Sequence, residues 1–357
     1  MPELPGTVDP PGDDPVPHAH FRLGDAPSRQ RYELWRDSIS CIFEVEAPPD
    51  LRAGGDFSAE IEASVFDSIM LARTRTLEQR WHRTPALMAR DGMDHYMIQL
   101  YEHGDMLWEA RDGARSFPTD GLVVFDLAQQ VKTRTNNFAN LSLFIPRIML
   151  EEHLKSSGDQ HLRVLTGREP MVQLLRDHML SLKRLAPRIS ARQAVAIAPA
   201  TVGLAAACLN AAVSPDDPRQ SSGVAMARTS AVKRFIELHL DDPRLSADRI
   251  ARQAGMSRSK LYELFEAYGG VARYVRHRRL RRALLALTDR THAHCTIYEI
   301  ALMVGYENDA AFIRAFRNRY GVTPLDVRMA GGIPAEAQRR TAGIDRRHEA
   351  WVHHLGL

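Results

Sequence analysis

Histidine and cysteine residues lie close together at two places where they could bind a metal ion. The stretch THAHC places His292, His294 and Cys295 side by side, and HAH places His18 and His20 near the N-terminus. Imidazole nitrogen and thiolate sulfur are the usual ligands of structural zinc, which takes four of them. No fourth ligand is evident beside THAHC, and HAH lies in a Pro-rich acidic segment. We therefore predict no metal site and no cofactor.

Other patterns typical of enzyme active sites are also missing from the sequence. A metal-dependent barrel enzyme usually combines a close pair of histidines with a carboxylate and a further histidine. Here His82, His95 and His103 are isolated in separate segments. The sequence contains no Gly-rich phosphate loop and no nucleophile elbow. We predict that the protein is not an enzyme.

The charges are distributed unevenly along the 357 residues. Residues 225–330 contain 19 Lys and Arg against 11 Asp and Glu, a net charge of +8, whereas residues 1–224 have a net charge of −6. An acidic first part and a basic second part predict two domains, the second with an anionic partner. The three cysteines are far apart and odd in number, which favours a reducing, cytoplasmic compartment.

A densely basic stretch, VRHRRLRRALLAL at 275–287, raises the question of which residues would meet a nucleic acid. Leu280, Leu284 and Leu287 recur at helical spacing and predict the buried stripe of a long helix. The arginines fall mainly on the other faces, where Arg276 and Arg279 could contact phosphate. We interpret this helix as a spacer whose arginines add electrostatic attraction to phosphate, not as the element that reads bases.

On either side of this helix, the sequence predicts a helix-turn-helix unit, at 246–267 and at 296–320. In each unit a short amphipathic helix ends at a glycine, Gly255 or Gly305, and a second helix follows after a tight turn. Aligning the two glycines gives an internal repeat of 50 residues. Two joined helices can enter successive major grooves on one face of DNA, about 34 Å apart.

The second unit resembles the C-terminal signature of AraC/XylS-type transcription regulators. The resemblance covers about 228–330. The family positions often occupied by Ser/Thr-Pro after the first recognition helix hold Val271-Ala272 here, and the usual aromatic before the last Arg is Val327. The matching elements of the signature are Ile300-Ala301, Gly305-Tyr306, Phe312, Arg314, Phe316, Tyr320-Gly321, Thr323-Pro324 and Arg328.

This resemblance implies double-stranded promoter DNA as a partner and assigns candidate contacts to the second helix of each unit. Arg314 suits guanine, Glu263 suits cytosine, and Tyr262 and Ala310 suit a thymine methyl group. Asp309 has an alternative role as a helix cap, and Arg314 has one as a backbone anchor. Base-facing candidates are Ser259, Tyr262, Glu263, Asp309, Ala310 and Arg314; phosphate candidates are Ser257, Arg258, Lys260, Arg276, Arg279, Asn308 and Arg317.

The first half of the chain shows another pattern. Short alternating runs separated by turn formers predict a β-barrel at about 57–145, preceded by a short helix at 28–40 and followed by helices over 146–213. This layout resembles the cupin-like sensor domain of the same family, which implies effector binding or dimerisation. Runs such as GLVVFDLAQ resemble a subgroup that regulates the catabolism of aromatic or amine-type compounds. Effector-binding candidates are Trp81, Tyr96, Gln99, Tyr101 and Trp108.

The fold class predicted is therefore α+β: a cupin-like barrel with trailing helices, and an all-α domain of two helix-turn-helix units joined by a linker helix. We expect a disordered Pro-rich tail at 1–27, a sensing and dimerisation domain at 28–213, a linker at 214–224, a DNA-binding domain at 225–330 and a loose tail at 331–357. The apolar run 189–213 is interpreted as a buried or interface helix and not as a membrane span.

The predicted function is an effector-responsive activator of a catabolic operon, acting as a homodimer with RNA polymerase in the cytoplasm at the nucleoid. Two alternatives stay open at this stage: a ligand-independent dimeric regulator, and a barrel enzyme that carries a DNA-binding appendage. The effector, the operator and the choice between activation and repression do not follow from the sequence.

Overall fold

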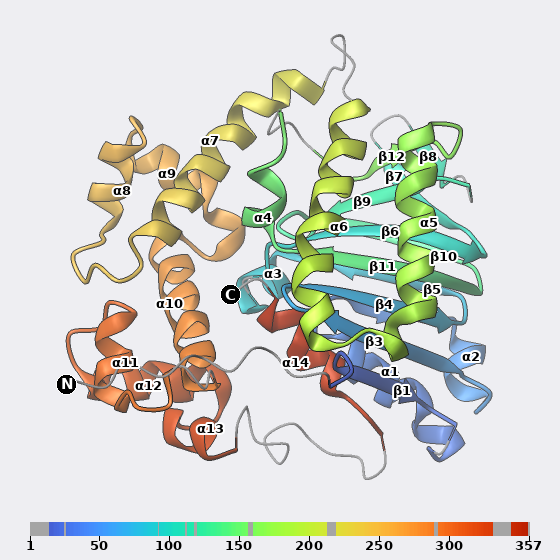
Figure 1. Cartoon of the computed structure of the whole chain (residues 1–357), viewed down its shortest axis with the longest axis horizontal. Coiled ribbons are helices and arrows are strands. Elements are labelled where there is room, and N and C mark those ends of the chain that lie inside the picture. Colours follow the sequence, from blue (N-terminus) through green and yellow to red (C-terminus); the bar gives the residue numbers. More distant parts are fainter. Residues whose placement is uncertain are drawn as a thin grey trace, which may run out of the picture.

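The computed structural model describes residues 14–24, 26–91, 93–110, 113–117, 120–155, 160–212, 219–288, 292–330 and 344–355. A β-rich N-terminal part with two long covering helices stands beside a purely helical part (Figure 1). The two parts meet along one long helix of the helical part. The predicted fold class is confirmed by this arrangement.

Within the described residues, twelve strands form two antiparallel sheets that face each other. The larger sheet has the order β1-β3-β4-β11-β6-β9-β12 and the smaller one β2-β5-β10-β7-β8. The sheets do not close into a continuous barrel, but they enclose a shared core as a cupin-like fold does. The strands are β1 His18–Arg22, β2 Glu44–Glu46, β3 Ala59–Phe66, β4 Ile69–Thr76, β5 Gln79–Arg83, β6 Tyr96–His103, β7 Met106–Ala110, β8 Gly113–Ser116, β9 Leu122–Asp126, β10 Val131–Thr135, β11 Phe138–Ile145 and β12 Arg163–Leu165.

The N-terminal part also contains helices that the alternating strand pattern did not all reveal. The short helix predicted at 28–40 is α1, and α5 and α6 are two of the trailing helices predicted after the barrel. The pattern missed α2 and α3, because a helix of one or two turns carries little periodic signal. The helices of this part are α1 Arg31–Ile39, α2 Pro49–Ala53, α3 Pro85–Asp91, α4 Arg147–Glu151, α5 Pro170–Leu185 and α6 Ala191–Ala211, with single 3₁₀ turns at Ser28–Gln30 and Ala186–Arg188.

Two apolar cores follow from the alternation of side chains in the larger sheet. One face packs against the smaller sheet, and the core between them is rich in aromatics from both sheets and α1, among them Trp35, Trp81, Phe125 and Phe138. The opposite face packs against α5 and α6. Strands that are buried on both faces read as continuous apolar runs, and β9 and β11 are buried along their whole length.

Helix α6 is long and apolar enough, by length and composition alone, to cross a membrane. One side of it instead packs on the larger sheet, where Ala198, Ala205 and Leu209 are fully buried. A capping box at Ser190 and Gln193 begins the helix. This packing agrees with the interpretation of a buried helix.

The helical part contains α7 to α13 and two separate apolar clusters. One cluster unites α7, α8, α9 and the first turns of α10, and the other unites the rest of α10 with α11, α12 and α13. The helices are α7 Arg219–Leu238, α8 Ala247–Gln253, α9 Arg258–Leu264, α10 Val271–Thr288, α11 Ile297–Met303, α12 Asp309–Tyr320 and α13 Pro324–Ala330, with a 3₁₀ turn η3 at Glu266–Tyr268.

Both termini differ from the sequence-based expectation. Residues 18–22 do not belong to a disordered tail, because they form β1 and pair with β3 from His18–Ser64 to Arg22–Glu60. At the other end, Arg347–His354 form helix α14, which packs against the N-terminal part. Residues 1–13, 331–343 and 356–357 of the two predicted tails lie outside the described residues, as do 214–218 of the predicted linker. Residues 219–224 of that linker instead form the beginning of helix α7, Arg219–Leu238.

Candidate nucleic-acid interface and barrel pocket

The first helix-turn-helix unit consists of α8 and α9. Ser246 begins α8 by accepting a hydrogen bond from the backbone N–H of Arg249, and Ser257 begins α9 by accepting one from Lys260. Gly255 lies between the helices with a φ of 59°, a left-handed conformation that favours glycine. Leu261 anchors α9 in the apolar cluster with full burial.

The second unit repeats this design with α11 and α12. Gly305 has a φ of 79°, and the turn hydrogen bond from Tyr306 N to Ala301 O measures 2.9 Å. The corresponding bond in the first unit, from Met256 N to Ala251 O, measures 3.0 Å. The two turns are therefore built alike, 50 residues apart. Asn308, and not Asp309, caps α12 by accepting from the backbone N–H of Ala311 at 2.8 Å.

Helix α10 joins the two units and contributes to both apolar clusters. Val271 and Tyr274 lie in the first cluster, and Leu280, Leu284 and Leu287 lie in the second. The stripe predicted from the leucine spacing is thus buried. Because one rigid helix is packed into both units, it fixes their separation.

The base-facing candidates all lie on exposed positions of α9 and α12. Tyr262 has 44% of its surface exposed, and the Arg314 side chain is exposed two turns into α12. The carboxylate of Glu263 accepts two hydrogen bonds from Lys260, at 2.9 and 3.0 Å. The exposed base-facing candidates are Ser259, Tyr262, Glu263, Asp309, Ala310 and Arg314.

The phosphate candidates are exposed with one exception. Arg258 pairs with Asp248 at 3.0 Å, on a surface where both side chains stay more than half exposed. Arg279 is the exception: its Nε donates to the Leu240 carbonyl at 2.9 Å and its Nη2 donates to the Asp242 carbonyl at 2.6 Å. Its guanidinium holds the chain after α7, and its contact with phosphate stays a prediction. The exposed candidates are Ser257, Arg258, Lys260, Arg276, Asn308 and Arg317.

A cavity of about 50 Å³ lies between the two sheets of the N-terminal part. Three of the five effector candidates, Trp81, Gln99 and Tyr101, line it. Its other walls are aromatic and aliphatic side chains together with the polar groups Thr133, Thr135, Asn140 and Ser142. All of its lining side chains are uncharged at neutral pH, and the Oδ1 atom of Asn140 is buried without a hydrogen-bond partner.

The other two effector candidates do not line this cavity. Tyr96 points to the opposite face of the larger sheet, where its hydroxyl accepts from Arg147 Nη1 at 2.8 Å and donates to Glu151 Oε1 at 3.0 Å. Trp108 is buried in the aromatic core but away from the cavity. Alternation along β6 places Tyr96 and Tyr101 on opposite faces, which a list of aromatic residues alone does not reveal.

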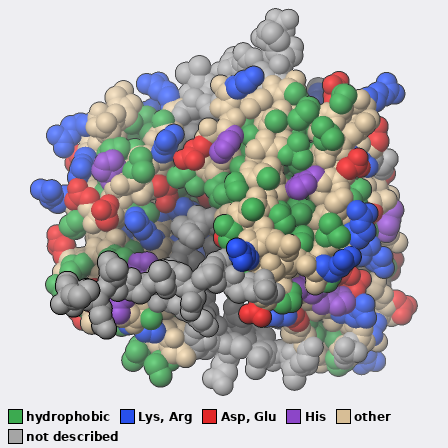
Figure 2. Space-filling model, viewed as in Figure 1, with side chains coloured by type: hydrophobic (Ala, Val, Ile, Leu, Met, Phe, Trp, Pro, Cys, Tyr) green, Lys and Arg blue, Asp and Glu red, His purple; other side chains and the backbone are tan. Residues whose placement is uncertain are grey.

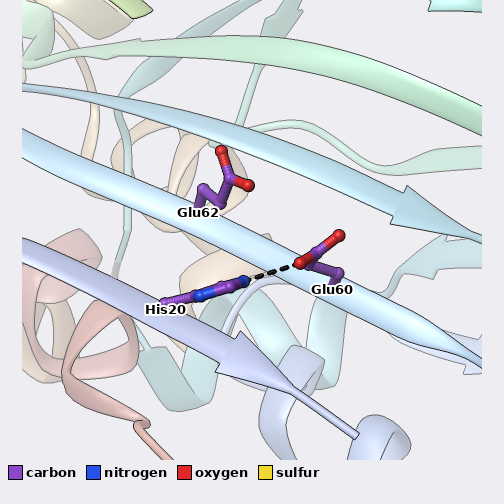
Figure 3. A group of neighbouring side chains, drawn as sticks. All are labelled: His20, Glu60 and Glu62. Carbon is purple, nitrogen blue, oxygen red and sulfur yellow. Dashed lines mark hydrogen bonds and ion pairs between the residues drawn. The ribbon is translucent and has the colours of Figure 1, made fainter. Parts of the chain in front are cut away.

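One histidine of the HAH stretch, His20, lies in a cluster of metal-ligand types, whereas the sequence alone showed no carboxylates beside it. His20 of β1 and Glu60 and Glu62 of β3 lie together on one face of the larger sheet (Figure 3). Glu60 is already occupied, because His20 Nε2 lies 2.6 Å and Arg22 Nη2 2.8 Å from its Oε1. Burial alone would raise the pKa of Glu60, but these two hydrogen bonds lower it. We assign no metal to this cluster.

A pair of helix-turn-helix units with exposed second helices, joined to an N-terminal domain of two facing sheets, defines a DNA-binding transcription regulator. An AraC-binding-like domain model matches residues 39–210, and a helix-turn-helix domain model matches residues 250–330. The regulatory protein SoxS of Escherichia coli (strain K12) is 33% identical over 96 residues, which are 26% of this chain and 86% of SoxS. The probable transcription factor PqrA of Proteus vulgaris is 34% identical over 92 residues, 25% of this chain and 73% of PqrA.

Among solved structures, the AraC-like transcriptional activator CuxR superposes with a TM-score of 0.54 at 24% identity, over 75% of this chain and 95% of CuxR. This likeness supports the fold over three quarters of the chain. The protein belongs to the AraC/XylS family of transcription regulators, as the signature in its second helix-turn-helix unit predicted.

Proposed function

We propose that this regulator binds promoter DNA as a homodimer in the cytoplasm and activates a catabolic operon, together with RNA polymerase, in response to a small effector. The observation that carries the proposal is the pair of recognition helices, α9 and α12, with exposed polar faces on a single spacer. Helix α10 has 18 residues, so its length is roughly 27 Å at 1.5 Å per residue. This length is close to the ~34 Å between successive major grooves on one DNA face.

Within this interface, Arg314 is proposed to recognise guanine through its forked donors, and Tyr262 and Ala310 to contact thymine methyl groups. The exposed side chains at the start of each recognition helix, such as Ser257, Lys260 and Asn308, are proposed to contact phosphates. Lys260 and Glu263 pair with each other on the exposed surface of α9. On DNA, Glu263 would accept a hydrogen bond from cytosine while Lys260 turns to a phosphate of the DNA backbone.

The barrel cavity favours a small uncharged effector. A charged ligand would be buried there without an opposite charge, which costs several kcal/mol. The unpaired Asn140 Oδ1 would accept a hydrogen bond from a donor such as an amide or hydroxyl group. At about 50 Å³ the cavity has room for only a few water-sized groups, so a larger effector requires the sheets to separate slightly.

The small volume also favours a second candidate: a regulator whose sensor domain dimerises without an effector. A thermal-shift screen with neutral aromatic amides, alcohols and amines separates the two candidates. An effector at 100 times its Kd would add about 2.7 kcal/mol to the unfolding free energy. A complete absence of shifts would favour the effector-independent candidate.

Dimerisation is proposed to use the outer face of α5 and α6. Figure 2 shows hydrophobic side chains gathered over these two helices. Leu174 and Val195 have 55% and 49% of their surfaces exposed on this face. Small residues such as Ala196, Ala200 and Gly203 on α6 would allow two helices to approach closely.

The test of the proposal is binding of the full-length protein to DNA from its own promoter region. Electrophoretic mobility shifts at 50 to 200 mM salt should show sequence-specific binding that weakens steeply as salt rises, since phosphate contacts release counterions. Binding that is absent at low salt, or equal for promoter and random DNA, would overturn the proposal.

A further inference from the structure

The C-terminal segment 344–355 is an integral part of the N-terminal core. It contains α14, which lies where the β-rich part meets α10 (Figure 1). Val352 is 0% and Leu355 is 4% exposed, and both belong to the aromatic core between the two sheets. Phe21 of β1 belongs to the same core although it lies near the other end of the chain, and this separation in sequence indicates that 344–355 is a docked element.

Polar contacts hold this segment on β1 and α1. Arg346 Nη1 donates to Asp37 Oδ2 at 2.9 Å, and the Ser38 hydroxyl donates to Glu349 Oε1 at 2.6 Å. The His348 ring packs edge-on against Phe21 at a centroid distance of 5.7 Å. These contacts place α14 directly against the turn of α1 that carries Asp37 and Ser38.

The same segment also contacts the DNA-binding part. Arg281 of α10 donates from Nη2 to the backbone carbonyl of Leu355 at 2.9 Å. His95 Nε2 lies 3.2 Å from that Nη2 atom and 3.1 Å from the Val352 carbonyl. Arg281 is only 8% exposed, so the end of α14 covers a buried charge of the spacer helix.

Other contacts between the two parts include several polar ones and the packing of Ala128 in the apolar cluster formed by α7 to α10. The Tyr268 hydroxyl donates to the Ala128 carbonyl at 3.0 Å, Arg278 lies 3.5 Å from Asp94, and Arg319 donates to the Asp91 carbonyl at 3.2 Å. Desolvation offsets much of the attraction in such buried ion pairs. The 344–355 segment adds to this docking through the buried hydrogen bond from Arg281 to the Leu355 carbonyl, while its apolar side chains Val352 and Leu355 hold it in the N-terminal core.

Helix α1 connects this docking with the barrel cavity. Ile39 and Ile42 line the cavity, and the neighbouring Asp37 and Ser38 hold α14. A second cavity of about 210 Å³ adjoins α14 between the two parts and is lined by Glu349, Arg281 and Arg319, among others. Space beside a docked helix permits a second position without displacing packed atoms.

We propose that residues 344–355 act as an intramolecular latch, which holds the DNA-binding part against the sensor part and transmits the state of the barrel cavity to it through α1. The latch thus has a holding step, in which it keeps the two parts together, and a transmission step, in which it responds to the barrel cavity. The transmission step rests on the effector site of the proposed function, whereas the holding step does not. The latch has two positions, and a ligand shifts the balance between them only as far as it favours one position. Release frees α10 from Arg281 onward, so that the recognition helices α9 and α12 of each protomer in a dimer can reach half-sites that the docked state does not match.

The holding step is tested by hydrogen exchange of the full-length protein. Val352→Asp should raise the exchange rates of η3, α3 and α14 at least tenfold, because a buried charge expels α14. Met329→Asp is the matched control, since it places the same charge on a side chain that is 81% exposed on α13. Unchanged exchange in Val352→Asp, or an equal change in both variants, would overturn the latch.

A truncation after Ala330 that stays folded gives a second test of the holding step. A synthetic peptide of residues 344–355, added to the truncated protein, should restore slow exchange in η3 and α3, and a scrambled peptide should not. Failure of the native peptide to restore protection in a folded truncated protein would contradict the holding step.

The transmission step is tested with Ile42→Ala, which enlarges the barrel cavity on the α1 side. Faster exchange in both α1 and α14 supports transmission, and a change confined to α1 refutes it. Promoter binding is measured on the same samples. Loss of interdomain protection with retained DNA binding supports the latch, whereas wild-type protein that binds no DNA would overturn the proposed function and leave the exchange result intact.

Discussion

Replacing Arg314 by alanine is the sharpest test of how α12 reads DNA. Arg314 is exposed and makes no contact with the apolar cluster, whereas Phe312 and Phe316 on the same helix are fully buried. The substitution should therefore change protein stability by less than about 0.5 kcal/mol. A lost bidentate contact to guanine should cost about 1–3 kcal/mol of binding free energy, or roughly 5- to 150-fold in Kd.

The assay measures Kd for the promoter site and for sites with each base pair changed in turn, at several salt concentrations. Arg314→Ala should abolish the preference at one base pair and leave the salt slope nearly unchanged. Arg317→Ala is the matched control, one helical turn further on, and should weaken binding to all sites alike while lowering the salt slope by about 0.9.

Two results would refute this reasoning. Uniform weakening by Arg314→Ala, with a reduced salt slope, would make Arg314 a backbone anchor. Wild-type affinity in both variants would remove α12 from the interface altogether.

Three further predictions concern stability and assembly. Gly305→Ala should destabilise the protein by about 1–3 kcal/mol in urea unfolding, since its φ is 79° and a Cβ would lie 2.4 Å from the Leu240 carbonyl oxygen; Gly203→Ala in α6, where a Cβ meets nothing within 4 Å, should be neutral or stabilising. Burial, with Arg346 nearby, lowers the pKa of His348 to about 4. The free energy of unfolding should therefore fall by roughly 3 kcal/mol as pH drops from 6.5 to 4, because the unfolded state binds a proton that the folded state rejects. A His348→Gln variant whose unfolding free energy falls with pH as steeply as that of the wild type would contradict this. Val195→Arg should convert a dimer to a monomer in light scattering, whereas an unchanged mass would exclude the α5–α6 face.

Local sequence patterns predicted the helical part in detail. Gly255 and Gly305 mark tight turns, and the leucine spacing of 275–287 marks the buried stripe of α10. These features depend on interactions within a few residues, which composition and spacing record directly. The arginines of α10 were harder to interpret, because periodicity shows which face is apolar but not what covers the polar faces. Arg279 therefore holds the chain after α7, and Arg281 faces α14.

The N-terminal part was predictable in outline only. The alternating runs located most of the longer strands, but His18–Arg22 was assigned to a tail because its pairing partner, β3, lies some 40 residues further along the chain. Strand formation depends on such distant neighbours more than on local propensity. The cavity-lining residues were predicted in part, since Trp81, Gln99 and Tyr101 line the cavity while Tyr96 faces the other side of β6.

The sequence by itself determined the family of this protein, its two helix-turn-helix units and the separation of charge between its two parts. These properties depend on residue types and on their spacing over short stretches of the chain. Only the tertiary structure decided which polar residues are available to ligands and how the two parts are joined. Residues 344–355 are the clearest case: their short helix has no strong pattern of its own, and its position is set by burial of Val352 and Leu355 against strands and helices from both ends of the chain.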